Sequence, residues 1–169
     1  MALSIRMIGL AAAAAMLATA AQAEAVKGAG FTASFPCRTK QTSQNVAAGN
    51  AAIPIVSYSC EGAGSLYYVV ASTYPKGFIA KKTLAAAYKD AVGGAAANVR
   101  GTVRTSQPIK LGAVGGREVL IDIPSDKAAA HLRLFFVGDK QFQVMIVGAK
   151  GRESAKPAMD FLGSFKLGK

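Results

Sequence analysis

His131 is the only histidine in the 169-residue chain, so a Ser-His-Asp or Cys-His catalytic site would have to be built on it. Around it, Leu132 and Leu134 alternate with His131 and Arg133, which is typical of a β-strand with one apolar face. We therefore interpret His131 as a residue at the start of a strand, at the rim of a sheet. A metal site would need further ligands, and the sequence contains no cluster of histidine or free cysteine that supplies them.

The carboxylates add little support for acid–base catalysis. Asp126, Asp139 and Asp160 are scattered at predicted turns or element ends, where aspartate commonly makes local hydrogen bonds. Asp122 lies inside an apolar run and could be a buried carboxylate with a perturbed pKa. A strand that alternates toward solvent explains the same residue more simply, and we favour that interpretation.

The glycine-rich segment Gly112–Glu118 admits two interpretations. Its backbone N–H groups and Arg117 could bind an anion, or the segment could form a tight connection between two strands. Because no helix follows it, the contribution of a helix dipole is missing, and we favour the connection. Serine-hydrolase, dinucleotide-binding and phosphate-loop motifs are absent from the sequence. We therefore expect neither catalytic residues nor a cofactor.

Cys37 and Cys60 are the only cysteines in the chain, and they do not form a Cys-x-x-Cys redox motif. In an exported protein such a pair predicts a disulfide. The bridge would close a loop of 24 residues. In the chain-entropy model it would stabilise the fold by about 3.4 kcal/mol.

The N-terminus has the pattern of a secretory signal peptide. A positive start at Met1–Arg6 precedes an apolar run at Met7–Ala20, and Ala21-Gln22-Ala23 fits a small-x-small cleavage site. We expect cleavage before Glu24, giving a signal at 1–23, a single domain at 24–169 and a periplasmic or secreted protein without a transmembrane segment. An uncleaved anchor helix is the alternative. Removal of residues 1–23 leaves 146 residues, and the net charge changes from +11 to +10.

This positive charge is the most unusual property of the mature chain. Aromatic residues are not interleaved with the basic ones, so we do not expect nucleic acid as a partner. An acidic envelope protein or an anionic envelope polymer would suit the charge, although a basic surface can also serve solubility alone. The candidate surface for an anionic partner comprises Lys81, Lys82, Lys89, Arg100, Arg104, Arg117, Lys150 and Arg152.

Hydrophobic periodicity predicts seven strands and two helices in the order β-β-β-α-β-β-β-β-α. The strands are expected at 31–35, 53–60, 66–74, 99–106, 117–123, 130–138 and 140–148. The third is apolar on both faces and should be central in the sheet. Residues 38–52 are small and polar and predict a surface loop.

The first helix should bury a stripe formed by Leu84, Ala87, Tyr88, Ala91 and Val92. Gly93-Gly94 is expected to end it. Ser154 is expected to cap the second helix, with Pro157 in its first turn. On strand 99–106, Arg100, Thr102 and Arg104 should share one face. Together these elements predict an α+β domain in which helices pack on an antiparallel sheet of six to seven strands.

The order of these residues resembles a known family. The segments that carry the resemblance are Phe31–Pro36, Tyr67–Val70, Ile109–Gly112 with Gly115–Glu118, Leu132–Phe136 and Phe161–Phe165. They are similar to bacterial exported domains with the fold of PsbP, the extrinsic photosystem II subunit, and of the Ran-binding nuclear import factor. The resemblance implies an α/β/α sandwich and a role in binding proteins or assisting assembly, with no catalytic residue to carry over. Cys37 and Cys60 are not part of the family pattern.

The sequence therefore favours a non-enzymatic binding or accessory protein that presents a basic surface to an acidic partner. An envelope factor that associates with anionic lipid or polysaccharide is an alternative. A small hydrolase, which would gather His131 or Asp122 with a nucleophile in a pocket, is the third hypothesis.

Overall fold

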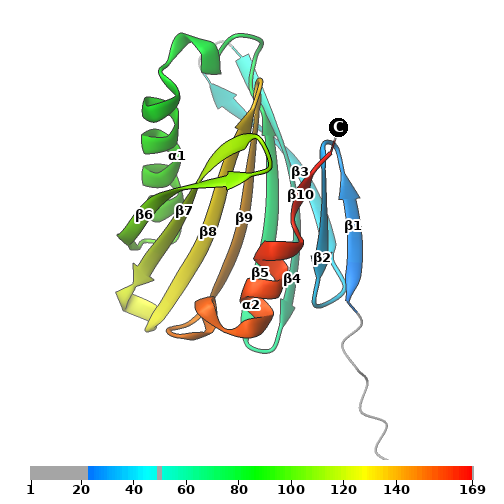
Figure 1. Cartoon of the computed structure of the whole chain (residues 1–169), viewed down its shortest axis with the longest axis vertical. Coiled ribbons are helices and arrows are strands. Elements are labelled where there is room, and N and C mark those ends of the chain that lie inside the picture. Colours follow the sequence, from blue (N-terminus) through cyan, green and yellow to red (C-terminus); the bar gives the residue numbers. More distant parts are fainter. Residues whose placement is uncertain (1–22, 49–50, 169) are drawn as a thin grey trace, which may run out of the picture.

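The computed structural model describes residues 23–48 and 51–168 (Figure 1). Within these residues a seven-stranded antiparallel sheet has the strand order β3-β4-β5-β9-β8-β7-β6. Its strands are β3 (Lys40–Ala48), β4 (Ala51–Gly62), β5 (Ser65–Thr73), β6 (Thr102–Leu111), β7 (Val114–Ile123), β8 (Ala128–Val137) and β9 (Lys140–Ala149). The expected signal peptide lies outside the described residues, except for Ala23.

A smaller antiparallel sheet has the order β1-β2-β10. Its strands are β1 (Glu24–Gly28), β2 (Phe31–Phe35) and β10 (Lys166–Leu167). The two α-helices of the described chain are α1 (Leu84–Asn98) and α2 (Lys156–Ser164). The described chain also contains three single turns of 3₁₀ helix, η1 (Ile79–Lys81), η2 (Pro124–Asp126) and η3 (Arg152–Ser154). None of the helices in the described part of the chain has the length and apolar character needed to cross a bilayer.

The large sheet lies between two layers. Helix α1 packs on one face, whereas α2 and the three-stranded sheet cover the other (Figure 1). This arrangement confirms the predicted α+β class and the antiparallel sheet with a helix on each side. As predicted, the doubly apolar strand β5 is internal, between β4 and β9. The three-stranded sheet is an addition to the prediction, because β1 and β10 are too short to show a clear period.

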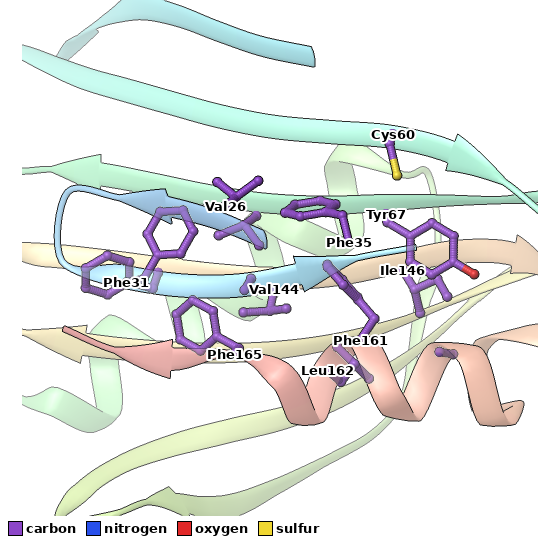
Figure 2. Packing of buried hydrophobic residues seen from close by; sticks show 14 of the residues in the cluster. Val26, Phe31, Phe35, Cys60, Tyr67, Val144, Ile146, Phe161, Leu162 and Phe165 are labelled. Carbon is purple, nitrogen blue, oxygen red and sulfur yellow. The ribbon is translucent and has the colours of Figure 1, made fainter. Parts of the chain in front are cut away.

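The two-residue period of the central strands produces two separate cores. Toward α1 the sheet buries aliphatic side chains, including Val119, Ile121, Leu132 and Leu134. Toward α2 the core is aromatic, and Figure 2 shows Phe31, Phe35, Phe161 and Phe165 converging between the small sheet and α2. The ring of Phe165 stacks on Phe135 at 5.8 Å and on Phe31 at 5.6 Å. Each core therefore needs its own covering layer.

The surface loop expected at 38–52 is wrong, because residues 40–48 form β3 and residues 51–52 begin β4. Strand β3 pairs with β4 along its whole length, from Lys40 opposite Ser59 to Ala48 opposite Ala51. It is the outer strand of the sheet, and the side chains from Lys40 to Ala47 are exposed or nearly so. A solvated edge strand can carry Thr, Gln and Ser on both faces, so it lacks the alternation by which strands are recognised.

Helix α1 does not end at Gly93-Gly94 as expected, but continues to Asn98. The three alanines that follow the glycines are strong helix formers, and Ala95 and Ala96 are buried against the sheet. Thr83 caps the helix by accepting a hydrogen bond from Ala86 N.

Helix α2 begins after Ala155 rather than at Ser154, which lies in η3, and no side chain caps it. Pro157 occupies its first turn, as predicted.

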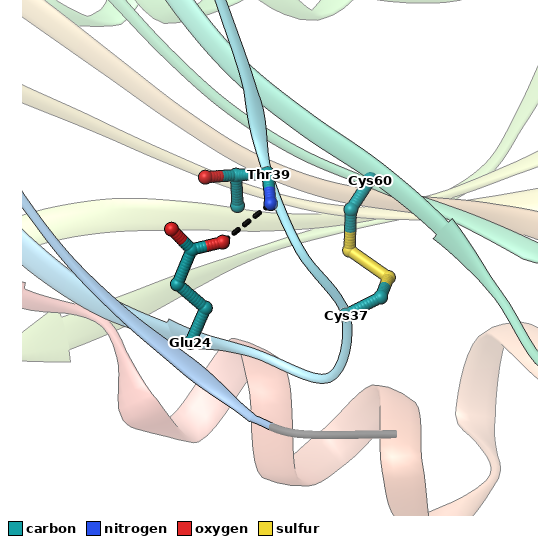
Figure 3. Close-up of a disulfide and its surroundings, with 4 residues drawn as sticks. All are labelled: Glu24, Cys37, Thr39 and Cys60. Carbon is teal, nitrogen blue, oxygen red and sulfur yellow. Dashed lines mark hydrogen bonds between the residues drawn. A yellow bond between two sulfur atoms is a disulfide. The ribbon is translucent and has the colours of Figure 1, made fainter. Parts of the chain in front are cut away.

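The disulfide between Cys37 and Cys60 is formed, with the two Cα atoms 5.8 Å apart. It joins the link between β2 and β3 to strand β4, and so ties the small sheet to the large one (Figure 3). Beside it, Thr39 N donates a 2.5 Å hydrogen bond to the carboxylate of Glu24. The first residue of the expected mature chain is thus held next to the bridge.

Replacing both cysteines, Cys37→Ser with Cys60→Ser, is expected to lower the free energy of unfolding by about 3 kcal/mol, because the unfolded chain regains the freedom of the open loop. Urea denaturation of both proteins in their mature form, from Glu24, measures this difference. Reductant should destabilise the parent to the level of the double variant and leave the double variant unchanged. Equal midpoints for the oxidised parent and the variant would contradict the prediction.

Candidate functional site

The structure places His131 in the middle of β8 rather than at the rim of the sheet, with only 5% of its surface exposed. Its Nδ1 lies 3.0 Å from the backbone oxygen of Glu153, and because a carbonyl only accepts, Nδ1 carries a proton. Nε2 lies 3.1 Å from Oε1 of Glu118 but has no hydrogen bond of good geometry within the described residues. His131 is buried because η3 packs over this part of β8.

Glu118 is the centre of this polar cluster. Arg133 Nε donates to Glu118 Oε1 at 2.8 Å, and Gln107 Nε2 donates to Oε2 at 3.3 Å. Burial alone would raise the pKa of Glu118, but the hydrogen bond and charge of Arg133, together with the hydrogen bond from Gln107, outweigh it and hold that pKa below its ordinary value. Arg133 also donates to the backbone oxygen of Leu162 at 3.1 Å. The cluster thus fastens α2 to the sheet.

A second charged cluster surrounds Asp122, which is half-exposed on β7, as the alternation predicts. Arg104 makes a bidentate contact with its carboxylate, and Lys150 lies 3.5 Å away. The hydrogen bond from Arg104 holds the pKa of Asp122 below its ordinary value. Arg104 also contacts the buried carboxylate of Glu153 at 3.4 Å. In this cluster the carboxylates are compensated, which suits a structural role.

Nothing in these clusters amounts to a metal centre. Across residues 23–48 and 51–168, no group of three or more His, Cys, Asp and Glu side chains is arranged to hold an ion.

The predicted basic surface is divided by the fold. Lys82 pairs with Asp90 at 2.5 Å, Arg104 and Lys150 pair with Asp122, and Arg152 donates to the backbone oxygen of Ala63. Arg100 precedes β6 instead of sharing its face with Arg104, because the strand begins at Thr102 and a bulge follows Val103. Lys81 and Arg100 are exposed near opposite ends of α1, and that helix is about 22 Å long.

Lys89 and Arg117 are brought together at the same hollow, beside α1. Two adjoining hollows, of about 350 and 540 Å³, share Ala85, Tyr88 and Arg117 and form what we call the α1 groove. The remaining lining residues are Leu84, Lys89, Val92, Ser106, Pro108, Ile109, Lys110, Gly115 and Gly116. Helix α1 is anchored along this side because Tyr88 Oη donates to Gly115 O at 2.7 Å.

Lys110 and Leu84 are among the groove residues that the sequence did not single out for binding. Lys110 is one lysine among many, and no periodicity distinguishes it. Leu84 begins the stripe expected to be buried, yet 53% of its surface is exposed in the structure. The helix stripe thus extends one apolar residue beyond the sheet that covers it. Such a residue can contact a partner rather than the core.

Glu118→Gln is expected to destabilise the fold by about 1–3 kcal/mol at pH 7, because Arg133 loses its counter-charge. Since the pair is partly exposed, the loss should be smaller than for a fully buried pair. The lowered pKa of Glu118 contributes stability that is present above its unfolded value, about 4.3, and is lost as the pH falls through the folded value. The variant should therefore lose less stability than the parent between pH 5 and pH 3, a range of about one pH unit on either side of the unfolded pKa.

Urea midpoints across this pH range measure the effect. Glu61→Gln is the matched control, because Glu61 is exposed and forms no ion pair with any described residue. An unchanged pH slope in Glu118→Gln, equal to that of the parent, would contradict the role assigned to Glu118.

The comparisons with known proteins concern the fold. No protein-family model matches the chain, and no curated protein sequence matches it. The chain is similar to the solution structure of cyanobacterial PsbP from Synechocystis sp. PCC 6803, with a TM-score of 0.57 and 8% identity, over 92% of this chain and 98% of that one. A crystal structure from Bacteroides thetaiotaomicron VPI-5482 matches at a TM-score of 0.45 and 14% identity, over 89% of this chain and 50% of that one. The chain therefore has a PsbP-like fold, in agreement with the resemblance seen in its sequence.

Proposed function

We propose that this protein is an exported, non-enzymatic binding or accessory protein of the cell envelope, and that its α1 groove binds an acidic partner protein. One observation carries the proposal. The groove combines apolar residues with Lys89, Lys110 and Arg117, and none of these three lies within 4.0 Å of an acidic side chain in the described residues.

Charge compensation elsewhere supports this choice of surface. Five of the nine acidic residues, Asp90, Glu118, Asp122, Glu153 and Asp160, are already engaged in ion pairs. Their pairing neutralises Lys82, Arg104, Arg133 and Lys156, and Lys150 lies beside Asp122. The cations that edge the groove keep their full charge and can attract an anionic partner over about 8–10 Å at physiological salt.

The shape and chemistry of the groove suit an amphipathic peptide segment. Leu84, Val92 and Pro108 offer apolar contacts, while the three cations stand beside them. A helix or extended segment that carries aliphatic or aromatic side chains flanked by Asp and Glu would bury the former and pair the latter. Export is supported by the signal-like N-terminus and by the disulfide, since disulfides persist in oxidising compartments.

Charge reversal in the groove, Lys89→Glu with Arg117→Glu, is expected to weaken partner capture at least tenfold, because two attractive contacts become repulsive. The matched control is Lys27→Glu with Lys166→Glu, which changes the net charge equally on the three-stranded sheet, away from α1. Crosslinking pull-down from envelope extract, with the mature protein at low and high salt, measures capture. The partner should be retained by the parent and the control, and released by salt.

Two results would contradict the proposal. The first is equal capture of the same protein by the groove variant and the parent. The second is enrichment of anionic lipid or polysaccharide without a protein, which would favour a surface-associating envelope factor.

Gly115→Leu tests the apolar part of the groove without any change in charge. A Cβ added at Gly115 meets no neighbouring atom within 4 Å, so the backbone there has room for a side chain, which would extend into the groove. Binding of the partner found in the pull-down should fall at least tenfold, while its salt dependence stays the same. Gly163→Leu, at an equally open position on α2, is the control and should bind normally. Undiminished binding by Gly115→Leu would remove the groove from the proposal.

A further inference from the structure

A second hollow lies on the other flank of α1, between the helix and strand β9. Its volume is about 250 Å³, and we call it the α1 cleft. The helix contributes Ala87, Asp90, Ala91, Gly94, Ala95 and Asn98, which are three or four residues apart and therefore share one face. The connection from β5 to α1 contributes Tyr74, Phe78, Ile79 and Lys82, and the sheet contributes Phe136, Gln141 and Gln143. The cleft shares no lining residue with the α1 groove.

Small side chains on the helix explain why the cleft is open. Where α1 faces β9 it carries mainly alanine and glycine, whose small side chains leave space beside the helix. A Cβ added at Gly94 would meet no neighbouring atom within 4 Å. The cleft is therefore open because the residues on this flank of α1 are small. On the opposite flank, Tyr88 anchors the helix to the sheet.

The polar groups of the cleft are amides and a phenol, and one of them is deeply buried. Gln141 is only 3% exposed, and its Oε1 accepts a 2.7 Å hydrogen bond from Tyr74 Oη. No hydrogen bond joins its amide nitrogen to a described residue, and this nitrogen is not sealed from solvent, so its two N–H donors are open to a molecule in the cleft. The cleft thus offers a ligand hydrogen bonds from a side chain whose other end is fixed by Tyr74.

The cleft carries no net charge. Lys82 and Asp90 both line it, but they pair with each other at 2.5 Å. The other polar side chains, Gln141, Gln143 and Asn98, are neutral amides. Beside them, Tyr74 and Phe78 stack at 5.4 Å with their planes only 11° apart, and Phe136 adds a third ring to the wall. The lining therefore suits a ligand that has many neutral hydrogen-bonding groups and one apolar face.

We propose that the α1 cleft binds one ring of a neutral sugar. A hydroxyl group both donates and accepts, which matches the amide side chains, and the C–H face of a pyranose can lie against the aromatic wall. The volume is below the ~300–1,000 Å³ of sites for drug-sized ligands, so the cleft has room for a single ring. This site is independent of the proposed protein partner, because it lies on the opposite flank of α1.

Titration of the mature protein with glucose, galactose, mannose and N-acetylglucosamine, followed by ¹H–¹⁵N NMR, tests the proposal. At least one sugar should shift the side-chain NH₂ signals of Gln141, Gln143 and Asn98, with a dissociation constant on the order of 1 mM, as expected for so small a ligand. Absence of such shifts for all four sugars would overturn it, and so would an equal response to inorganic phosphate, because the proposed site is neutral.

Two matched variants locate the binding. Gly94→Leu should fill the cleft and abolish the shifts, whereas Gly93→Leu should leave them unchanged. Both replace an exposed glycine of α1 by leucine and raise helix propensity equally, but only Gly94 lines the cleft. Binding that persists in Gly94→Leu would place the sugar elsewhere and overturn the assignment. The groove variant Lys89→Glu with Arg117→Glu should bind the sugar normally, which separates this inference from the proposed function.

Discussion

The fold depends on a large sheet that is apolar on both faces. Because successive side chains point to opposite sides, the sheet presents one apolar surface toward α1, mainly from β7 and β8, and another toward α2, mainly from β5 and β9. Neither surface can remain in water, so the chain needs two covering layers. Helix α1 supplies the first, and α2 with the three-stranded sheet supplies the second. The disulfide secures the second layer by joining the β2–β3 link to β4.

Charge compensation differs between the two faces of this basic protein. Glu118 and Asp122 project from β7 on the face toward α2, and arginines from neighbouring strands meet them there. These pairs hold α2 and η3 against the sheet, so the charges serve cohesion. The cations beside α1 have no such partners in the described chain, and their field is directed outward from an apolar groove. The same composition thus stabilises one face and leaves unpaired cations beside the other.

The composition of α1 explains why both candidate sites flank it. Its first half carries Leu84 and Tyr88 toward β7, whereas its other flank presents alanine and glycine toward β9. A helix of small residues covers the core below it but does not fill the space at its sides. The hollow near β7 is edged by cations and the one near β9 by amides, so the two flanks suit different ligands.

The sequence by itself determined the fold class, the disulfide, the central position of β5 and the excess of positive charge, because these follow from local periodicity, cysteine count and composition. It misjudged β3, because this edge strand has no apolar face. It ended α1 too early, because burial of Ala95 and Ala96 favours continuing the helix past two glycines. It placed His131 at the rim, because η3, which covers this residue, lies far along the chain. Only the tertiary structure decided which cations are neutralised and which meet at one groove. Ion pairs and hollows join residues distant in the chain, and no local pattern encodes those distances.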